Sequence, residues 1–176
     1  FVIFQIFKDS KTLSGLIKIS KIVIIILFVL HTAGLIARWY ISGHAPWSDA
    51  YESMIYVAWA TMLFGLLFGR KSDLTMASTA FVTAMILMIA HWNWMDPAIA
   101  NLQPVLDSYW LMIHVSIIVG SYGPFTLGMI LGAVALILMI ATTKKNKKKM
   151  DLTIKEITII TEMALTVGLV MLTIGN

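Results

Sequence analysis

Cysteine is absent from this 176-residue chain, and charged residues are scarce, at 12% of the composition. Without cysteine the chain has no disulfide framework, no thiolate metal ligand and no cysteine redox pair. Hydrophobic residues reach 59% and the mean hydropathy is +0.88, whereas about a quarter of the residues in a soluble domain are charged. The composition therefore indicates an integral membrane protein.

Apolar runs predict four complete transmembrane helices, at residues 21–41, 52–69, 74–92 and 110–142. Backbone groups in lipid must bond within their own segment, so these runs are helices and not strands. The apolar stretches "FVIFQIF" and "MALTVGLVMLTIGN" at the two ends are shorter than the ~20 residues of a span, and indicate two truncated helices. We therefore predict an all-α, multi-span helical bundle, a single membrane domain over 1–176 that is a fragment at both ends.

All but one of the 13 Lys and Arg residues fall in three alternate connections, at 8–21, 69–73 and 143–156. The positive-inside rule places these connections in the cytoplasm. Connections 42–51 and 93–109 then lie in the periplasm, if the membrane is a bacterial inner membrane. The "KKNKKK" run is typical of a topology anchor that touches anionic lipid, and we expect no nucleic-acid partner.

A histidine and an arginine interrupt the first long apolar run. His31 lies ten residues beyond Lys21, about 15 Å along a helix and near the middle of the bilayer. A titratable group at that depth is functional by default, although it can also bond a neighbouring helix. Arg38, the one basic residue outside the three connections, can pair with Asp49 or Glu52, or can neutralise an anionic ligand.

The run 110–142 is about 50 Å long as a helix, too long for a hydrocarbon core of ~30 Å. The "GSYGP" string at 120–124 predicts a kink or break, with His114 one or two turns outside the lipid core. His44 and His91 fall on the same outer side, among many aromatic residues. Tryptophan and tyrosine gather at any membrane interface, but a histidine-bearing aromatic face also suits haem, whose iron takes axial His. These aromatic residues are Trp39, Tyr40, Trp47, Tyr51, Trp92, Trp94, Tyr109 and Trp110.

Two strings, "HTAGLIARWYISGHAPWSDAYESMIY" (31–56) and "MDPAIANLQPVLDSYWLMIHVSIIVGSY" (95–122), resemble the CcsA family of system II cytochrome c biogenesis. The likeness is closest to the Bacteroides-type forms. It implies a protein that works with a CcsB partner, receives haem and presents it at the outer membrane face. There the haem, b-type while in transit, is joined to the Cys-x-x-Cys-His motif of an apocytochrome c.

The resemblance also implies site residues. His114 matches an outer histidine of the family and is the expected axial ligand of the haem iron, and His31, Arg38 and Trp110 are further haem-binding candidates. The family's tryptophan-rich WWD segment and its second outer histidine would follow Asn176, so the fragment is truncated before them. Full-length members act as haem lyases with CcsB, and enzymatic activity of the fragment itself stays open.

Two other functions are compatible with the residues. The first is a haem-b electron-transfer subunit, in which His91 and His114 bracket a permanent outer haem. The second is a haem-independent transporter with Arg38 and His31 along its path, which broken helices and an internal repeat would favour. No repeat is visible in the sequence.

Overall fold

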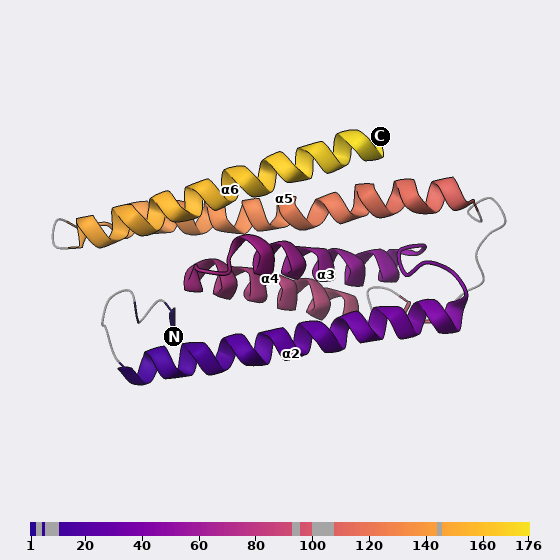
Figure 1. Ribbon diagram of the computed structural model, residues 1–176, viewed down its shortest axis with the longest axis horizontal. Helices are drawn as coiled ribbons and strands as arrows, with labels where there is room; N and C mark the ends of the chain where they lie inside the picture. Colours follow the sequence, from indigo (N-terminus) through magenta and orange to yellow (C-terminus); the bar gives the residue numbers. More distant parts are fainter. Residues whose placement is uncertain (3–4, 6–10, 93–95, 100–107, 144–145) are drawn as a thin grey trace.

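The structure, a computed structural model, describes residues 1–2, 5, 11–92, 96–99, 108–143 and 146–176 (Figure 1). Within these residues the backbone forms five long helices and no strand. They are α2 (Lys11–Ser42), α3 (Ala50–Phe68), α4 (Asp73–His91), α5 (Tyr109–Ala141) and α6 (Lys147–Gly175). By length and composition each helix can cross a membrane, which confirms the predicted helical membrane class.

The helices lie in three layers (Figure 1). The antiparallel pair α5–α6 forms one layer, α3 and α4 form the middle layer, and α2 lies beyond them. The main core lies along α5 and α6, where Leu127, Leu131, Met150 and Ile157 are almost wholly buried. Helix α2 is peripheral, because only 6% of its most apolar stretch is buried, against 44% for α4.

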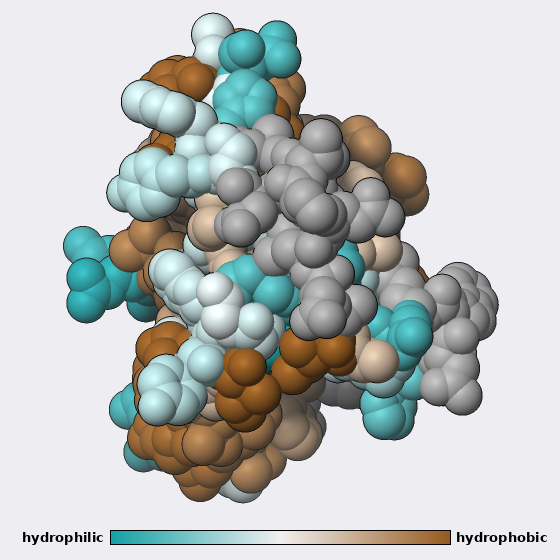
Figure 2. Space-filling model, turned by 90° about the vertical axis from the view of Figure 1, so that its right-hand side faces the viewer, coloured by the Kyte–Doolittle hydropathy of each residue, from teal (hydrophilic) through white to brown (hydrophobic). Residues whose placement is uncertain are grey.

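This arrangement gives the molecule two different ends. The end that we call the tryptophan-rich end carries the connection 43–49, residues 96–99 and the first turns of α3 and α5. The opposite end, the lysine-rich end, carries the first turns of α2, α4 and α6 together with the connection 69–72. Figure 2 looks at the tryptophan-rich end, where teal and near-white surfaces gather, while brown apolar surface covers the lower flank.

Helix α6 differs from the sequence prediction. We expected a polar connection as far as residue 156 and a truncated helix after it, but the helix begins at Lys147 and has 29 residues, enough to cross a membrane. The reason is an amphipathic pattern in which Met150, Ile157 and Ile160 all face the core. In the part of the chain that the structure describes, five helices, and not four, therefore reach spanning length.

Helix α5 also differs, because it runs unbroken through the "GSYGP" string and encloses Pro124. Gly123 lies so close to α3 that an added Cβ would come within 2.7 Å of the Ala60 backbone, and Pro124 itself is fully buried. The string thus supplies a close helix contact. Of the predicted kink or break, the break is wrong, because packing against α3 holds the helix together where the proline removes a hydrogen bond.

Candidate functional site

The connection between α2 and α3 folds tightly at the tryptophan-rich end. Gly43 has a positive φ of 72°, the left-handed conformation that commonly ends a helix, and its amide donates to the Trp39 carbonyl at 3.0 Å. Asp49 caps α3, with its Oδ1 accepting from the Glu52 amide at 2.6 Å. The Ser48 hydroxyl donates to the Ala45 carbonyl at 2.8 Å. These local bonds bring the polar residues of the connection over the start of α3.

Glu52 lies at the centre of the polar contacts at this end, and its carboxylate is fully buried. Its Oε1 accepts from Arg38 Nε at 2.9 Å and its Oε2 accepts from the Ser48 amide at 3.0 Å. His44 Nδ1 lies 3.7 Å from Oε2, close enough to interact by charge when the ring is protonated. A buried carboxylate is stable only when it is paired and hydrogen-bonded, and Glu52 meets both conditions.

All three nitrogens of the Arg38 guanidinium have a partner within the protein. Its Nη1 donates to the Pro97 carbonyl at 3.0 Å and its Nη2 to the Ala98 carbonyl at 3.4 Å, while Nη2 also lies 3.8 Å from Asp49 Oδ2. The guanidinium carbon lies 5.2 Å from the centre of the Tyr51 ring. The predicted pairing with Asp49 and Glu52 is confirmed, and the side chain joins α2, α3 and the second connection.

Five aromatic rings continue from this polar centre toward the middle of the bundle, and we call them the aromatic ladder. Neighbouring ring centres lie 4.9–6.0 Å apart, in the order Trp39, Trp47, Tyr56, Trp59 and Phe28. Three of the rings also have their polar atoms bonded. Trp47 Nε1 donates to the Met112 carbonyl at 3.1 Å, the Tyr56 hydroxyl to the Ser116 carbonyl at 3.4 Å, and Trp59 Nε1 to Thr32 Oγ1 at 2.9 Å. The ladder therefore binds α3 to both α2 and α5.

His114 lies on a different side of α5. The carbonyls of Met112 and Ser116 accept the bonds from the aromatic ladder. His114 is two residues from each of them, which places it about 200° around the helix from both. Its side chain is exposed. Trp110, one turn earlier on the same face, is 80% exposed. One turn later, Ile118 packs against Gly175 at the end of α6. His114 and Trp110 thus form an open face just beyond the last turn of α6.

This open face fits a flat, apolar ligand that carries a metal ion. An exposed imidazole can offer a ring nitrogen to iron, and the indole of Trp110 offers a flat apolar surface one turn away. Among the described residues, no group of three His, Asp or Glu side chains could hold a metal ion without such a ligand.

The four predicted site residues, His31, Arg38, Trp110 and His114, are not bonded to one another in the described part of the chain. Among the described residues, no hydrogen bond, ion pair or ring contact joins Arg38 or His31 to Trp110 or His114. His31 lies beside a cavity of about 150 Å³ between α2, α3 and α4, and its Nε2 is buried without a hydrogen-bond partner in the described part of the chain. His91 ends α4 and is exposed.

The sequence analysis did not predict the aromatic ladder, which runs from the tryptophan-rich end toward the middle of the bundle. Glu52, Tyr56 and Trp59 follow the spacing i, i+4, i+7, which places them on one face of a helix. From that spacing, the shared helix face of these three residues could have been predicted. The bonds from Trp47 to Met112 and from Tyr56 to Ser116 span about sixty residues of sequence, and no local pattern points to these partners.

The fold and this end together define a polytopic helical membrane protein with a polar, aromatic end and one exposed histidine on its longest helix. The family model described as cytochrome C assembly protein matches residues 47–176. The chain belongs to this cytochrome c assembly family.

Its relatives agree with this assignment. The chain is 47% identical over 151 residues to "Protein NrfI" of Wolinella succinogenes, which covers 86% of this chain and 17% of that protein. It is 33% identical over 129 residues to "Cytochrome c biogenesis protein CcsA" of Lotus japonicus, covering 68% and 38%. The protein of the same name from Synechococcus sp. (strain CC9605) is 35% identical over 133 residues, covering 73% and 43%. The chain thus spans less than half the length of these relatives, and the predicted resemblance to the CcsA family is confirmed.

Proposed function

We propose that this chain is part of a protein that handles haem and presents it at the outer membrane face for covalent attachment to apocytochrome c. The observation that carries the proposal is the open face of α5, where His114 and Trp110 are exposed in a chain of the cytochrome c assembly family. In this proposal His114 would hold the haem iron through a ring nitrogen, and Trp110 would offer its indole as an apolar surface for the porphyrin. When bound, the haem supplies the vinyl groups that form thioether bonds with the apocytochrome.

Arg38 has a positioning role in this proposal. Three of its five N–H groups donate to Glu52, Pro97 and Ala98, which supports a role in fixing the two connections of the tryptophan-rich end, and contact with a haem propionate stays the alternative proposal. His31 remains a proposed haem-binding residue. Its ring lines a separate cavity between α2, α3 and α4. A CcsB-type partner and an apocytochrome c are the proposed protein partners.

The proposed membrane is the bacterial inner membrane, with the lysine-rich end in the cytoplasm. The positive-inside rule supports this orientation. Cysteines introduced at Asp96 and at Asn146, which are both exposed and lie at opposite ends, test it in the full-length protein. An impermeant thiol reagent added to cells with a permeabilised outer membrane should label the Asp96 variant. Labelling of the Asn146 variant instead would reverse the orientation.

The central test is His114→Ala in the full-length protein. Loss of the imidazole should lower the amount of bound haem, change its absorption spectrum and abolish cytochrome c maturation. Added imidazole should restore part of the haem signal by filling the vacated iron position, which a purely structural histidine would not allow. A stably produced variant with an unchanged haem spectrum and normal maturation would contradict the assignment.

His91→Ala is the matched control, since this residue is also an exposed histidine and lies at the end of α4. We expect it to leave haem binding and maturation unchanged. The electron-transfer alternative expects the opposite, because there His91 and His114 ligate the same haem. Equal losses of haem in the two variants would favour that alternative.

A further inference from the structure

The first turns of α5 extend beyond α6, the helix that packs along the rest of α5. Gly175, at the end of α6, lies against Ile117, and α5 continues past this point (Figure 1). We call residues 109–116 the outer segment of α5. This segment is about 12 Å long as a helix, and it carries both His114 and Trp110. Its orientation therefore decides where the imidazole and the indole point.

The local sequence does little to hold the outer segment. The first four amides of any helix have no partner within the helix, so a helix end opens more easily than its middle. The N-cap residue Ser108 makes no side-chain hydrogen bond among the described residues, and the first turn of α5 holds no acidic residue to balance the helix dipole. The direction of the segment must then depend on contacts with other elements.

Two bonds of the aromatic ladder supply such contacts. Trp47 Nε1 donates to the Met112 carbonyl at 3.1 Å, and the Tyr56 hydroxyl donates to the Ser116 carbonyl at 3.4 Å. These carbonyls lie one turn apart on one face of α5, while His114 stands between them in sequence and faces away. The rings of Trp47 and Tyr56 are packed together, with their centres 4.9 Å apart. Two linked donors on one face oppose rotation of the segment about its axis.

Gly120 makes room for this contact one turn further along α5. A Cβ added at Gly120 would lie 3.2 Å from the hydroxyl oxygen of Tyr56, tighter than ordinary van der Waals contact. A larger residue at this position would press on the hydroxyl that donates to Ser116. The close packing of α3 against α5 thus includes space for the Tyr56 bond.

We propose that Trp47 and Tyr56 are positioning residues for His114. Their two bonds fix the rotation of the outer segment, so that the imidazole of His114 and the indole of Trp110 face outward together. A binding site functions when its side chains are held closely in place by the residues behind them. The part of this inference that concerns haem rests on the proposed function, whereas the effect on α5 needs no haem. Trp47 contributes more than Tyr56, because its bond is the shorter one.

Hydrogen exchange in the full-length protein, prepared without haem, tests the effect on α5. Trp47→Phe and Tyr56→Phe each remove one donor and keep most of the ring packing. Amides of the outer segment should exchange about fivefold faster in Trp47→Phe, and by a smaller factor in Tyr56→Phe, because a lost bond makes local opening easier. Unchanged exchange of the outer segment in both variants would overturn the proposal.

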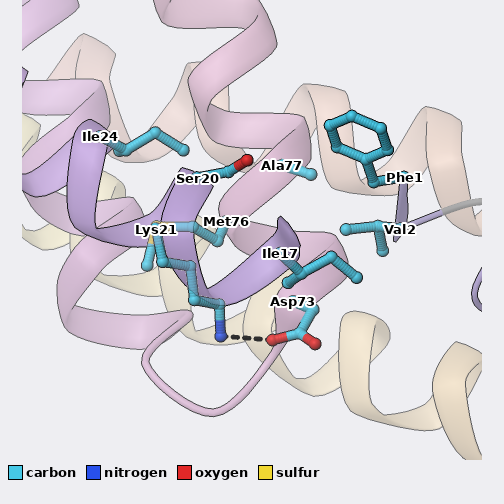
Figure 3. A pocket seen from close by; sticks show the side chains of 9 residues that line it. All are labelled: Phe1, Val2, Ile17, Ser20, Lys21, Ile24, Asp73, Met76 and Ala77. Atoms are coloured by element: carbon cyan, nitrogen blue, oxygen red, sulfur yellow. Dashed lines mark ion pairs between the residues drawn. The ribbon is translucent and has the colours of Figure 1, made fainter. Parts of the chain in front are cut away.

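Two control variants remove contacts elsewhere. Trp59→Phe is the matched control, since Trp59 belongs to the same ladder but donates to Thr32 on α2 and not to α5. Lys21→Gln breaks the ion pair with Asp73 at the lysine-rich end (Figure 3). Neither change should alter exchange in the outer segment. An equal acceleration in Trp59→Phe would mean that the ladder acts only through general stability, and the proposal would be wrong.

The haem readout is a double-mutant cycle in the full-length protein. Trp47→Phe should retain about fivefold less haem and shift its absorption spectrum, while in a His114→Ala background the same change should have no further effect. Equal losses in the two backgrounds would show that Trp47 does not act through His114, which overturns the proposal. If His114→Ala leaves haem unchanged while exchange still responds to Trp47→Phe, the proposed function and the haem part of this inference are wrong, and only the fixing of α5 is confirmed.

Discussion

The two ends of the bundle each hold an ion pair that joins α2 to a neighbouring helix, but in different surroundings. At the tryptophan-rich end Arg38 and Glu52 have side chains that are 14% and 0% exposed. At the lysine-rich end the side chains of Lys21 and Asp73 are 26% and 46% exposed. A buried pair fixes geometry because either partner alone is costly, whereas an exposed pair contributes little. The comparison indicates that α2 is held firmly at one end and loosely at the other.

The buried pair is tolerated because other groups satisfy it. Glu52 also accepts from the Ser48 amide, and Arg38 also donates to two carbonyls of the second connection. No comparable set of bonds surrounds Lys21 and Asp73 in the described part of the chain. The four predictions below vary the partners at each end and run from the largest expected effect to the smallest.

Glu52→Ala should have the largest effect, because it leaves the Arg38 guanidinium buried without its carboxylate. Loss of one partner of a buried ion pair costs about 3–5 kcal/mol of the free energy of unfolding. Denaturant titration of the purified protein in detergent, followed by circular dichroism, measures this loss. Asp73→Ala is the control and should cost no more than about 1 kcal/mol. Similar losses in the two variants would remove the distinction between the ends.

Arg38→Lys should have a smaller effect, because it keeps the positive charge beside Glu52. The lysine lacks the planar fork that reaches the Pro97 and Ala98 carbonyls, and bonds of this kind contribute about 1.5–3 kcal/mol. We expect a loss in that range, with faster proteolysis near residues 96–99. Arg70→Lys at the lysine-rich end, where Arg70 is exposed, should leave both measurements unchanged. Normal proteolysis in Arg38→Lys would show that the second connection does not depend on Arg38.

Trp47→Phe removes one hydrogen bond from the aromatic ladder and keeps most of the ring packing. The lost bond from Nε1 to the Met112 carbonyl should lower the free energy of unfolding by about 1 kcal/mol. The control is Tyr40→Phe, since Tyr40 is 89% exposed and should tolerate the change. If both variants unfold alike, the bond from Trp47 to α5 contributes nothing measurable.

Lys21→Gln should have the smallest effect, at most about 1 kcal/mol, because the pair with Asp73 is partly exposed. The difference from the unmodified protein should disappear when denaturation is repeated in 1 M salt, which screens exposed charges. Glu52→Ala should keep its deficit under the same conditions. A deficit of Lys21→Gln that persists in high salt would indicate that this pair is as strongly coupled as the buried one.

The sequence predicts the helical architecture well because lipid imposes long apolar runs. It also predicts the partners of Arg38, since Asp49 and Glu52 follow within fourteen residues. The sequence-based prediction fails at residues 147–156 and at "GSYGP", because there the backbone conformation depends on packing against another helix. Met150 and Ile157 become helical by facing α5, and Pro124 stays helical because Gly123 meets Ala60. Contacts across sixty residues, such as Trp47 with Met112, leave no local pattern.

The engagement of Arg38 has a consequence for any anionic ligand at the tryptophan-rich end. Arg38 is the only Lys or Arg of this chain away from the lysine-rich connections, and each nitrogen of its guanidinium already donates one bond, to Glu52, Pro97 or Ala98. Under the proposed haem assignment, a ligand held by His114 and Trp110 finds no Lys or Arg of this chain at the tryptophan-rich end other than Arg38, so coordination and apolar contact carry most of its binding to this face. Its retention on this face should therefore vary little with ionic strength, since counterions screen charge pairs and leave coordinate bonds intact.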